Sequence, residues 1–208
     1  MPDPTTSAPV TIADAIDSAV VRYTERNPQS ALQYERAVQV MPGGNTRTVL
    51  YYSPFPLAIA RGEGCRLWDA DGHEYVDFIA EFTAGLYGHS NPVIRKALDR
   101  ALDDGINLSG HNLLESELAH LICDRFPAVD AVRFTNSGTE ANLMAISAAR
   151  VHTGRDKVIV FEGGYHGGVL TFASGNSPVN VPHDVLIASY NDLASVQDLF
   201  ESHVDEVA

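Results

Sequence analysis

The chain has 208 residues, of which 45% are hydrophobic, and this composition is typical of a globular protein with a hydrophobic core. Its formal net charge of -13 argues against nucleic acid or an anionic membrane as a general partner. No apolar run reaches the roughly 18 residues that a membrane-spanning helix needs, so none is predicted.

The N-terminus and the cysteines indicate the compartment. Residues 1–10 are rich in proline and threonine and lack the basic and apolar regions of a secretory signal, so we expect a disordered tail. Cys65 and Cys123 lie far apart and have no metal-ligand spacing. We therefore expect a reducing, cytoplasmic setting and no bound metal.

After the tail, residues 11–82 predict N-terminal helices and a small antiparallel unit. Apolar residues recur with helical spacing from Thr11 to about Val40, and Asn27-Pro28 interrupts them, so two helices are expected. Further on, alternating residues predict strands and glycine-containing segments predict turns. The expected strands are 57–61, 66–69 and 74–78, and the expected turns are 62–64 and 71–72.

Residues 83–208 predict part of a larger α/β domain. Apolar strands that alternate with helices indicate a parallel sheet covered on both faces. The expected helices are 92–102, 113–126, one that begins at Ser137, and 192–202, and the expected strands are 131–135, 158–161 and 185–188. At residues 206–208, where the sequence ends, we expect a further buried strand to begin.

A strand-to-helix junction is the first candidate binding motif. Residues 133–142 read RFTNSGTEAN. Ser137 can cap a helix, and Glu140 completes a Ser-x-x-Glu capping box. Gly138 permits close approach of a ligand to the backbone. Free N–H groups and the positive end of the helix dipole make such a junction a predicted phosphate site, although an ordinary capped helix has the same local pattern.

A glycine-rich turn is the second candidate motif. Residues 158–168 read VIVFEGGYHGG, so a buried strand leads into four glycines that surround Tyr165 and His166. Glycines on both sides leave the ring faces open to a flat ligand. A purely structural turn is the alternative interpretation.

Together, residues 136–141 (NSGTEA) and 164–167 (GYHG) resemble the class III aminotransferases, which are fold-type I enzymes of pyridoxal phosphate. Residues 62–72 resemble the early hairpin of that family. Residues 41–47 (MPGGNTR) are similar to the branch of glutamate-1-semialdehyde aminomutase and the β-amino-acid aminotransferases. The likeness runs from about Met41 to the end. It implies the N-terminal portion of a truncated fold-type I α/β enzyme that is a homodimer when complete.

The resemblance also implies how pyridoxal 5'-phosphate is bound. Ser137, Gly138 and Thr139 correspond to the phosphate anchor. Tyr165 corresponds to the ring that stacks on the cofactor, and His166 to the same wall.

For the substrate, the resemblance implies that Arg47 binds the carboxylate, since a planar guanidinium can donate two parallel hydrogen bonds to it. Glu81 lies in a segment that the family uses near the substrate or the dimer partner. Its neighbours Tyr51, Tyr52, Pro54, Phe55 and Pro56 are expected to form a semi-apolar wall beside Arg47.

The catalytic lysine is missing from this sequence. Lys96 and Lys157 are the only lysines. The family's Schiff-base lysine and its pyridinium-pairing acid fall beyond residue 208, so no catalytic residue is assigned. We predict that the 208-residue chain alone does not transaminate.

Three functions remain open at this point. The first is transfer of an amino group between an amino acid, preferably a β-amino acid, and a 2-oxo acid. The second is glutamate-1-semialdehyde 2,1-aminomutase activity, and the third is a non-catalytic truncated remnant. The aromatic wall favours the transaminase with a bulky apolar substrate.

Overall fold

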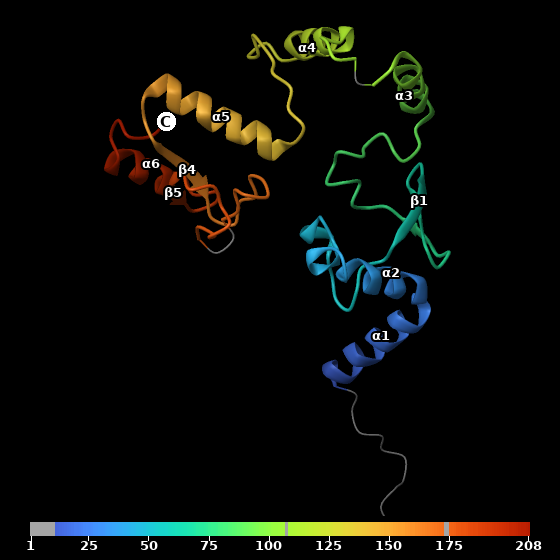
Figure 1. The fold of residues 1–208 in the computed structure, drawn as a ribbon. Helices are drawn as coiled ribbons and strands as arrows, with labels where there is room; N and C mark the ends of the chain where they lie inside the picture. The colour runs from blue at the N-terminus through green and yellow to red at the C-terminus, as the bar shows by residue number, and fades with distance from the viewer. Residues whose placement is uncertain (1–10, 107, 173–174) are drawn as a thin grey trace, which may run out of the picture. The chain divides into compact units, whose positions relative to one another are not determined.

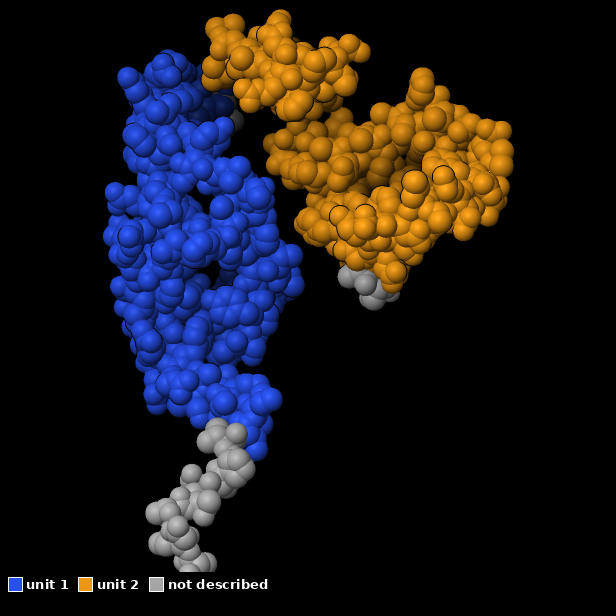
Figure 2. All heavy atoms as spheres, turned by 180° about the vertical axis from the view of Figure 1, so that it is seen from behind, with its two compact units in different colours: residues 1–108 blue, residues 109–208 orange. Residues whose placement is uncertain are grey.

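The computed structural model describes residues 11–106, 108–172 and 175–208. It divides into two compact units, residues 1–108 and 109–208, which Figure 2 colours separately. The predicted domain boundary at residues 82/83 differs from this division and stays a prediction. The predicted tail, residues 1–10, lies outside the described residues.

The first unit begins with the two expected helices (Figure 1). Helix α1 (Ile12–Arg26) starts at a reciprocal capping box: Thr11 Oγ1 accepts from the Asp14 N–H at 3.2 Å, and Asp14 Oδ2 accepts from the Thr11 N–H at 2.9 Å. Helix α2 (Pro28–Val38) starts directly after Asn27. Its first residue is proline, which is favourable there because the first helical N–H has no intrahelical partner.

A distant carboxylate caps α2. Asn27 makes no side-chain cap hydrogen bond. Instead Asp71 Oδ1 accepts from the Gln29 N–H at 2.7 Å, and its Oδ2 accepts from the Ser30 N–H at 3.1 Å. The Ser30 hydroxyl also donates to Oδ2, at 2.9 Å. A negative charge at a helix N-terminus is stabilising, so this contact fixes the turn after β2 to α2.

The predicted antiparallel unit is confirmed as three strands in the order β1-β2-β3. They are β1 (Ile59–Glu63), β2 (Arg66–Asp69) and β3 (Glu74–Val76). The third strand is shorter than expected, because Asp77 Oδ1 accepts from the N–H groups of Ile79 and Ala80 and turns the chain. Helix α3 (Pro92–Asp104) completes the helices of this unit, as predicted.

Asp69 is the buried polar centre of the sheet. It is 3% exposed, and its carboxylate accepts hydrogen bonds from the Asp71 N–H (3.0 Å), the His73 N–H (2.8 Å) and the Tyr75 hydroxyl (2.7 Å). Its Oδ2 also lies 2.9 Å from His73 Nδ1. Burial alone would raise the pKa of Asp69, but the hydrogen bonds from Tyr75 and His73 outweigh burial and lower it.

The stability of this unit is expected to depend on pH through three aspartates. The pKa of Asp77 is lowered by hydrogen bonds from the Ala80 N–H and the His89 ring. The pKa of Asp71 is also lowered, because the Gln29 and Ser30 bonds outweigh burial. With folded pKa values below the unfolded value of about 3.9, the stabilisation is complete above that value and is lost as the pH falls through the folded values.

Urea unfolding followed by circular dichroism between pH 7 and pH 2 checks this dependence. The midpoint is expected to stay high down to about pH 4 and then to fall. The variant D71N should make the midpoint fall less between about pH 4 and pH 2, whereas D17N, at an exposed position of α1, should leave the fall unchanged. A midpoint that stays level or rises towards pH 2 would contradict the assignment.

The second unit contains a parallel pair of strands and its helices. Strands β4 (Lys157–Phe161) and β5 (Asp184–Ala188) pair in register from Lys157↔Asp184 to Phe161↔Ala188, which confirms the predicted parallel sheet. The helices are α4 (Leu113–Arg125), α5 (Gly138–Thr153) and α6 (Leu193–Ser202). The core consists of Val160, Leu170 and Phe172, and residues Leu143 and Ile146 of α5 pack against it.

Two strand predictions for this unit had different outcomes. Residues 131–135 do not form the expected strand, because a strand requires a paired backbone and no described residue pairs with them. The second prediction concerns residues 206–208. The Lys157 N–H donates to the Glu206 carbonyl at 3.1 Å, and the Ala208 N–H donates to the Lys157 carbonyl at 2.9 Å. Residues 206–208 therefore pair in parallel with the start of β4, where a further strand was expected.

Candidate functional site

The predicted phosphate motif forms the N-terminus of α5. The Ser137 backbone is extended (φ -156°, ψ 160°), and its Oγ accepts from the Glu140 N–H at 3.1 Å. The other half of the predicted capping box is shifted by one residue, because Glu140 Oε2 accepts from the Asn136 N–H at 2.8 Å. Both side chains thus hold the strand-to-helix junction in one conformation.

This junction leaves donors available. Within the described part of the chain, the N–H groups of Gly138 and Thr139 have no hydrogen-bond acceptor. They lie in the first turn of a 16-residue helix, where the dipole is positive. The junction therefore offers backbone donors to an anion.

The glycine-rich turn packs directly against this junction. The Gly168 N–H donates to Thr139 Oγ1 at 3.1 Å, and Asn142 Nδ2 donates to the His166 carbonyl at 2.7 Å. A Cβ atom on Gly167 would lie 2.5 Å from Thr139 Oγ1, and the φ of Gly167 is +130°. The structure thus brings together two motifs that are separated in the sequence, and their contact requires glycine at position 167.

Tyr165 and His166 point into different surroundings. Tyr165 is 69% exposed, so the faces of its ring are accessible to a ligand. The His166 ring lies inward, 6.0 Å from the ring of Phe172, and its buried Nε2 has no partner among the described residues. Tyr165 is therefore the better placed of the two for stacking. The predicted binding roles of both residues stay predictions.

These groups fit pyridoxal phosphate. Its phosphate needs donors, which the free N–H groups and the hydroxyl groups of Ser137 and Thr139 supply. Its flat ring needs an exposed aromatic face, which Tyr165 supplies.

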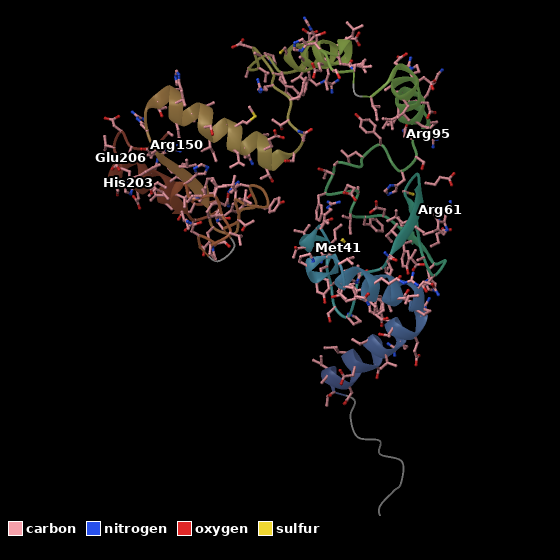
Figure 3. All side chains as sticks on the ribbon, viewed as in Figure 1. Met41, Arg61, Arg95, Arg150, His203 and Glu206 are labelled. Carbon is pink, nitrogen blue, oxygen red and sulfur yellow. The ribbon has the colours of Figure 1, made fainter. Side chains whose placement is uncertain are left out.

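The predicted substrate residues lie in the first unit. Arg47 precedes a 3₁₀ turn (Thr48–Leu50) and follows another (Pro42–Gly44). Its Nη1 lies 2.6 Å from Glu81 Oε2. Arg47 also lines a cavity of about 610 Å³. Its other lining residues, mostly apolar or aromatic, are Met41 (labelled in Figure 3), Asn45, Thr46, Leu50, Tyr51, Tyr52, Pro56, Leu57, Ile59, Leu67, Tyr75, Val76, Asp77, Phe78 and Ile79.

The expected wall is present in part. Tyr51, Tyr52 and Pro56 line the cavity as expected, whereas Pro54 does not. Phe55 does not line it, because the Phe55 side chain is buried, with its ring centroid 5.1 Å from that of Tyr23. The Tyr23 hydroxyl donates to the Phe55 carbonyl at 2.8 Å, and burial together with the Tyr52 hydroxyl raises the pKa of Tyr23.

The two lysines lie in different surroundings. Lys96 is exposed on α3. Lys157 Nζ lies 2.8 Å from Asp184 Oδ2 and 3.4 Å from Glu206 Oε2, at the end of β4 opposite the glycine turn. The hydrogen bond to Asp184 raises the pKa of Lys157, which is the opposite of what a nucleophilic amine needs.

Several contacts of these sites could not be read from the sequence. The Arg47–Glu81 pair joins residues 34 positions apart, and the Asn142–His166 bond joins residues 24 apart.

No described group of three or more His, Cys, Asp or Glu side chains could hold a metal ion. Among the described residues, no helix has the length and apolar character needed to cross a bilayer.

Comparisons with known proteins identify the family of the chain. Residues 50–201 match the family model for class-III aminotransferases. The chain is 58% identical, over 197 residues, to the β-phenylalanine transaminase of Variovorax paradoxus, and the match covers 95% of the chain and 45% of that protein. The crystal structure of the V. paradoxus enzyme superposes with a TM-score of 0.91, at 57% identity and with coverage of 95% of the chain and 46% of that structure. The chain thus spans about half the length of the relatives it matches.

Two other solved structures are also similar. A transaminase with pyridoxal phosphate bound gives a TM-score of 0.79 at 32% identity, with 87% of the chain and 46% of that structure covered. A glutamate-1-semialdehyde aminomutase from Pseudomonas aeruginosa gives 0.76 at 25% identity, with 92% and 46% covered. The α/β fold and the predicted cofactor are confirmed. The chain belongs to the class-III aminotransferases, a family that uses pyridoxal 5'-phosphate.

Proposed function

We propose that the protein containing this chain transfers an amino group between a β-amino acid and a 2-oxo acid. The observation that carries the proposal is the contact between Gly167 and Thr139. This contact joins the turn that exposes Tyr165 to the phosphate cradle, which is the N-terminus of α5 with Ser137, Gly138 and Thr139. The identity of 58% to a β-phenylalanine transaminase supports the substrate class. The aminomutase alternative has less support, because the likeness to such an enzyme is 25%.

Each site residue has a defined task in this proposal. Bound pyridoxal phosphate supplies an electron sink for reactions at the carbon that bears the amino group. The N–H groups of Gly138 and Thr139 hold the phosphate, and Tyr165 covers one face of the ring. Arg47 holds the substrate carboxylate. The cavity beside Arg47, of about 610 Å³, accepts an apolar or aromatic side chain.

We further propose that the complete protein is a cytoplasmic homodimer and that the 208-residue chain alone is inactive. The support for inactivity is the state of its lysines. Lys157 is held as a protonated amine by Asp184 and Glu206. No other described lysine lies in the unit that carries the cradle. Lys96 is exposed on α3 of the first unit, and neither lysine stands where the family resemblance implies the Schiff-base lysine.

Reduction with borohydride tests this proposal. The 208-residue chain and the product of the full reading frame are each incubated with pyridoxal phosphate and borohydride, and the covalently bound label is located by mass spectrometry. The full product is expected to retain a label on one lysine and to deaminate β-phenylalanine with 2-oxoglutarate as acceptor. The short chain is expected to retain no specific label and to show no turnover. K157M is the matched control and should change neither result. Turnover by the short chain, or a label at Lys157, would contradict the proposal.

A further inference from the structure

The carboxylate nearest to Arg47 belongs to the chain itself. Arg47 Nη1 and Glu81 Oε2 are 2.6 Å apart, and their side chains are 48% and 51% exposed. The contact uses one nitrogen of the guanidinium group, whereas a carboxylate that binds in the bidentate mode uses two. Glu81 therefore holds Arg47 by a single, solvent-accessible interaction.

Glu81 also lies in a conformationally unfavourable segment. Ala80, Glu81, Phe82 and Thr83 have φ values of 45°, 51°, 53° and 76°. Consecutive left-handed residues other than glycine are disfavoured and persist only where other contacts hold them. The Asp77 carboxylate anchors the start of this segment through the Ala80 N–H at 3.0 Å, and the Gly85 N–H returns to the Ala80 carbonyl at 2.9 Å. Release of the Glu81 side chain would allow this turn to relax.

The cavity beside Arg47 suits one carboxylate on an apolar body. Arg47 is the only cationic side chain among the described lining residues, and Glu81 is not a lining residue. An incoming carboxylate needs the same guanidinium group that Glu81 already contacts. Two carboxylates cannot both take the full fork of one arginine, so they compete.

We infer that Glu81 is an internal competitor that occupies Arg47 when substrate is absent and is displaced by the substrate carboxylate. Glu81 is then a specificity-determining residue, because its hold on Arg47 sets how strongly a carboxylate must bind in order to enter. This inference rests on the proposed role of Arg47 as the substrate's carboxylate site.

Binding of 3-phenylpropionate tests the inference. This compound carries the carboxylate and the aromatic body of the proposed substrate but has no amino group, so its affinity reports the carboxylate site alone. Calorimetry on the full gene product loaded with cofactor is expected to show that E81Q lowers the Kd roughly twofold to fivefold, the range set by the cost of breaking an exposed ion pair. E81A should also lower the Kd for 3-phenylpropionate.

The control is a similar exposed pair in the same unit. Arg61 Nη1 and Glu63 Oε2 are 3.5 Å apart, with side chains 57% and 71% exposed (Figure 3 labels Arg61). E63Q removes a charge of the same kind and should leave the Kd unchanged. In the wild type, 3-phenylpropionate should also speed amide hydrogen exchange at residues 80–83, and R47M should abolish this effect together with the gain from E81Q.

The outcomes separate this inference from the proposed function. If R47M abolishes binding while E81Q leaves the Kd unchanged or raises it, Glu81 is not a competitor and the inference fails alone. If R47M has no effect in either background, Arg47 is not the carboxylate site, and that part of the proposed function fails together with the inference.

Discussion

Replacing Gly167 with alanine is expected to lower the affinity for pyridoxal phosphate at least about tenfold. The new Cβ atom would lie 2.5 Å from Thr139 Oγ1 and 2.9 Å from Thr139 Cα. Its backbone, at φ +130°, is also one that residues with a Cβ atom rarely adopt. Strain of this kind costs about 1–3 kcal/mol, and relief requires the turn to move away from the N-terminus of α5. Since Gly168 and Tyr165 move with that turn, the cradle opens.

Gly168→Ala is the matched control. Gly168 is the next residue of the same turn, and a Cβ atom there meets nothing within 4 Å. Cofactor titration followed by absorbance, on the full gene product, should show the loss for G167A and an affinity near that of the wild type for G168A. The melting temperature measured without cofactor separates lost binding from lost folding. Equal affinities for G167A and the wild type would show that the close contact with Thr139 does not shape the site.

The second large effect is expected at Asp69. Asp69→Ala should destabilise the first unit by about 2–4 kcal/mol, because a buried donor left without its acceptor costs about 1–3 kcal/mol and several donors share this carboxylate. The Asp69 side chain is fully buried, and its loss would leave the Tyr75 hydroxyl and the His73 N–H without their acceptor.

Urea unfolding of the 208-residue chain and of the full gene product measures this loss. Asp69→Asn keeps the shape and part of the hydrogen bonding, so its free energy of unfolding should lie between those of D69A and the wild type. Asp17→Ala, at an exposed position of α1, should lie within about 0.5 kcal/mol of the wild type. A loss below about 1 kcal/mol for D69A would mean that water replaces the carboxylate at this position.

The elements that the sequence predicted correctly are those with local causes. The start of α1 depends on Thr11 and Asp14, which are three residues apart. The start of α5 likewise depends on Ser137 and Glu140. The glycine-rich turn and the turn at residues 71–72 carry their own glycine signals. The first hairpin turn, expected at 62–64, lies at residues 64–65, because β1 extends to Glu63.

The features that the sequence did not predict depend on distant partners. The strand expected at residues 131–135 is absent because its β-propensity is not accompanied by a described neighbour to pair with. The Arg47–Glu81 pair spans 34 residues, and no local pattern announces it. Phe55 was expected in the wall of the cavity, but the Tyr23 ring covers it. Each case depends on which distant residue becomes the contact partner, and local secondary-structure propensity does not determine that.

The Asp71 contact has a consequence for how the first unit comes apart. Because a residue of the β2–β3 turn supplies the cap of α2, the helix cannot fray from its N-terminus without breaking the anchor of that turn. The two segments therefore belong to a single cooperative block despite their distance along the chain. Neither would keep its conformation if it were excised and transplanted alone.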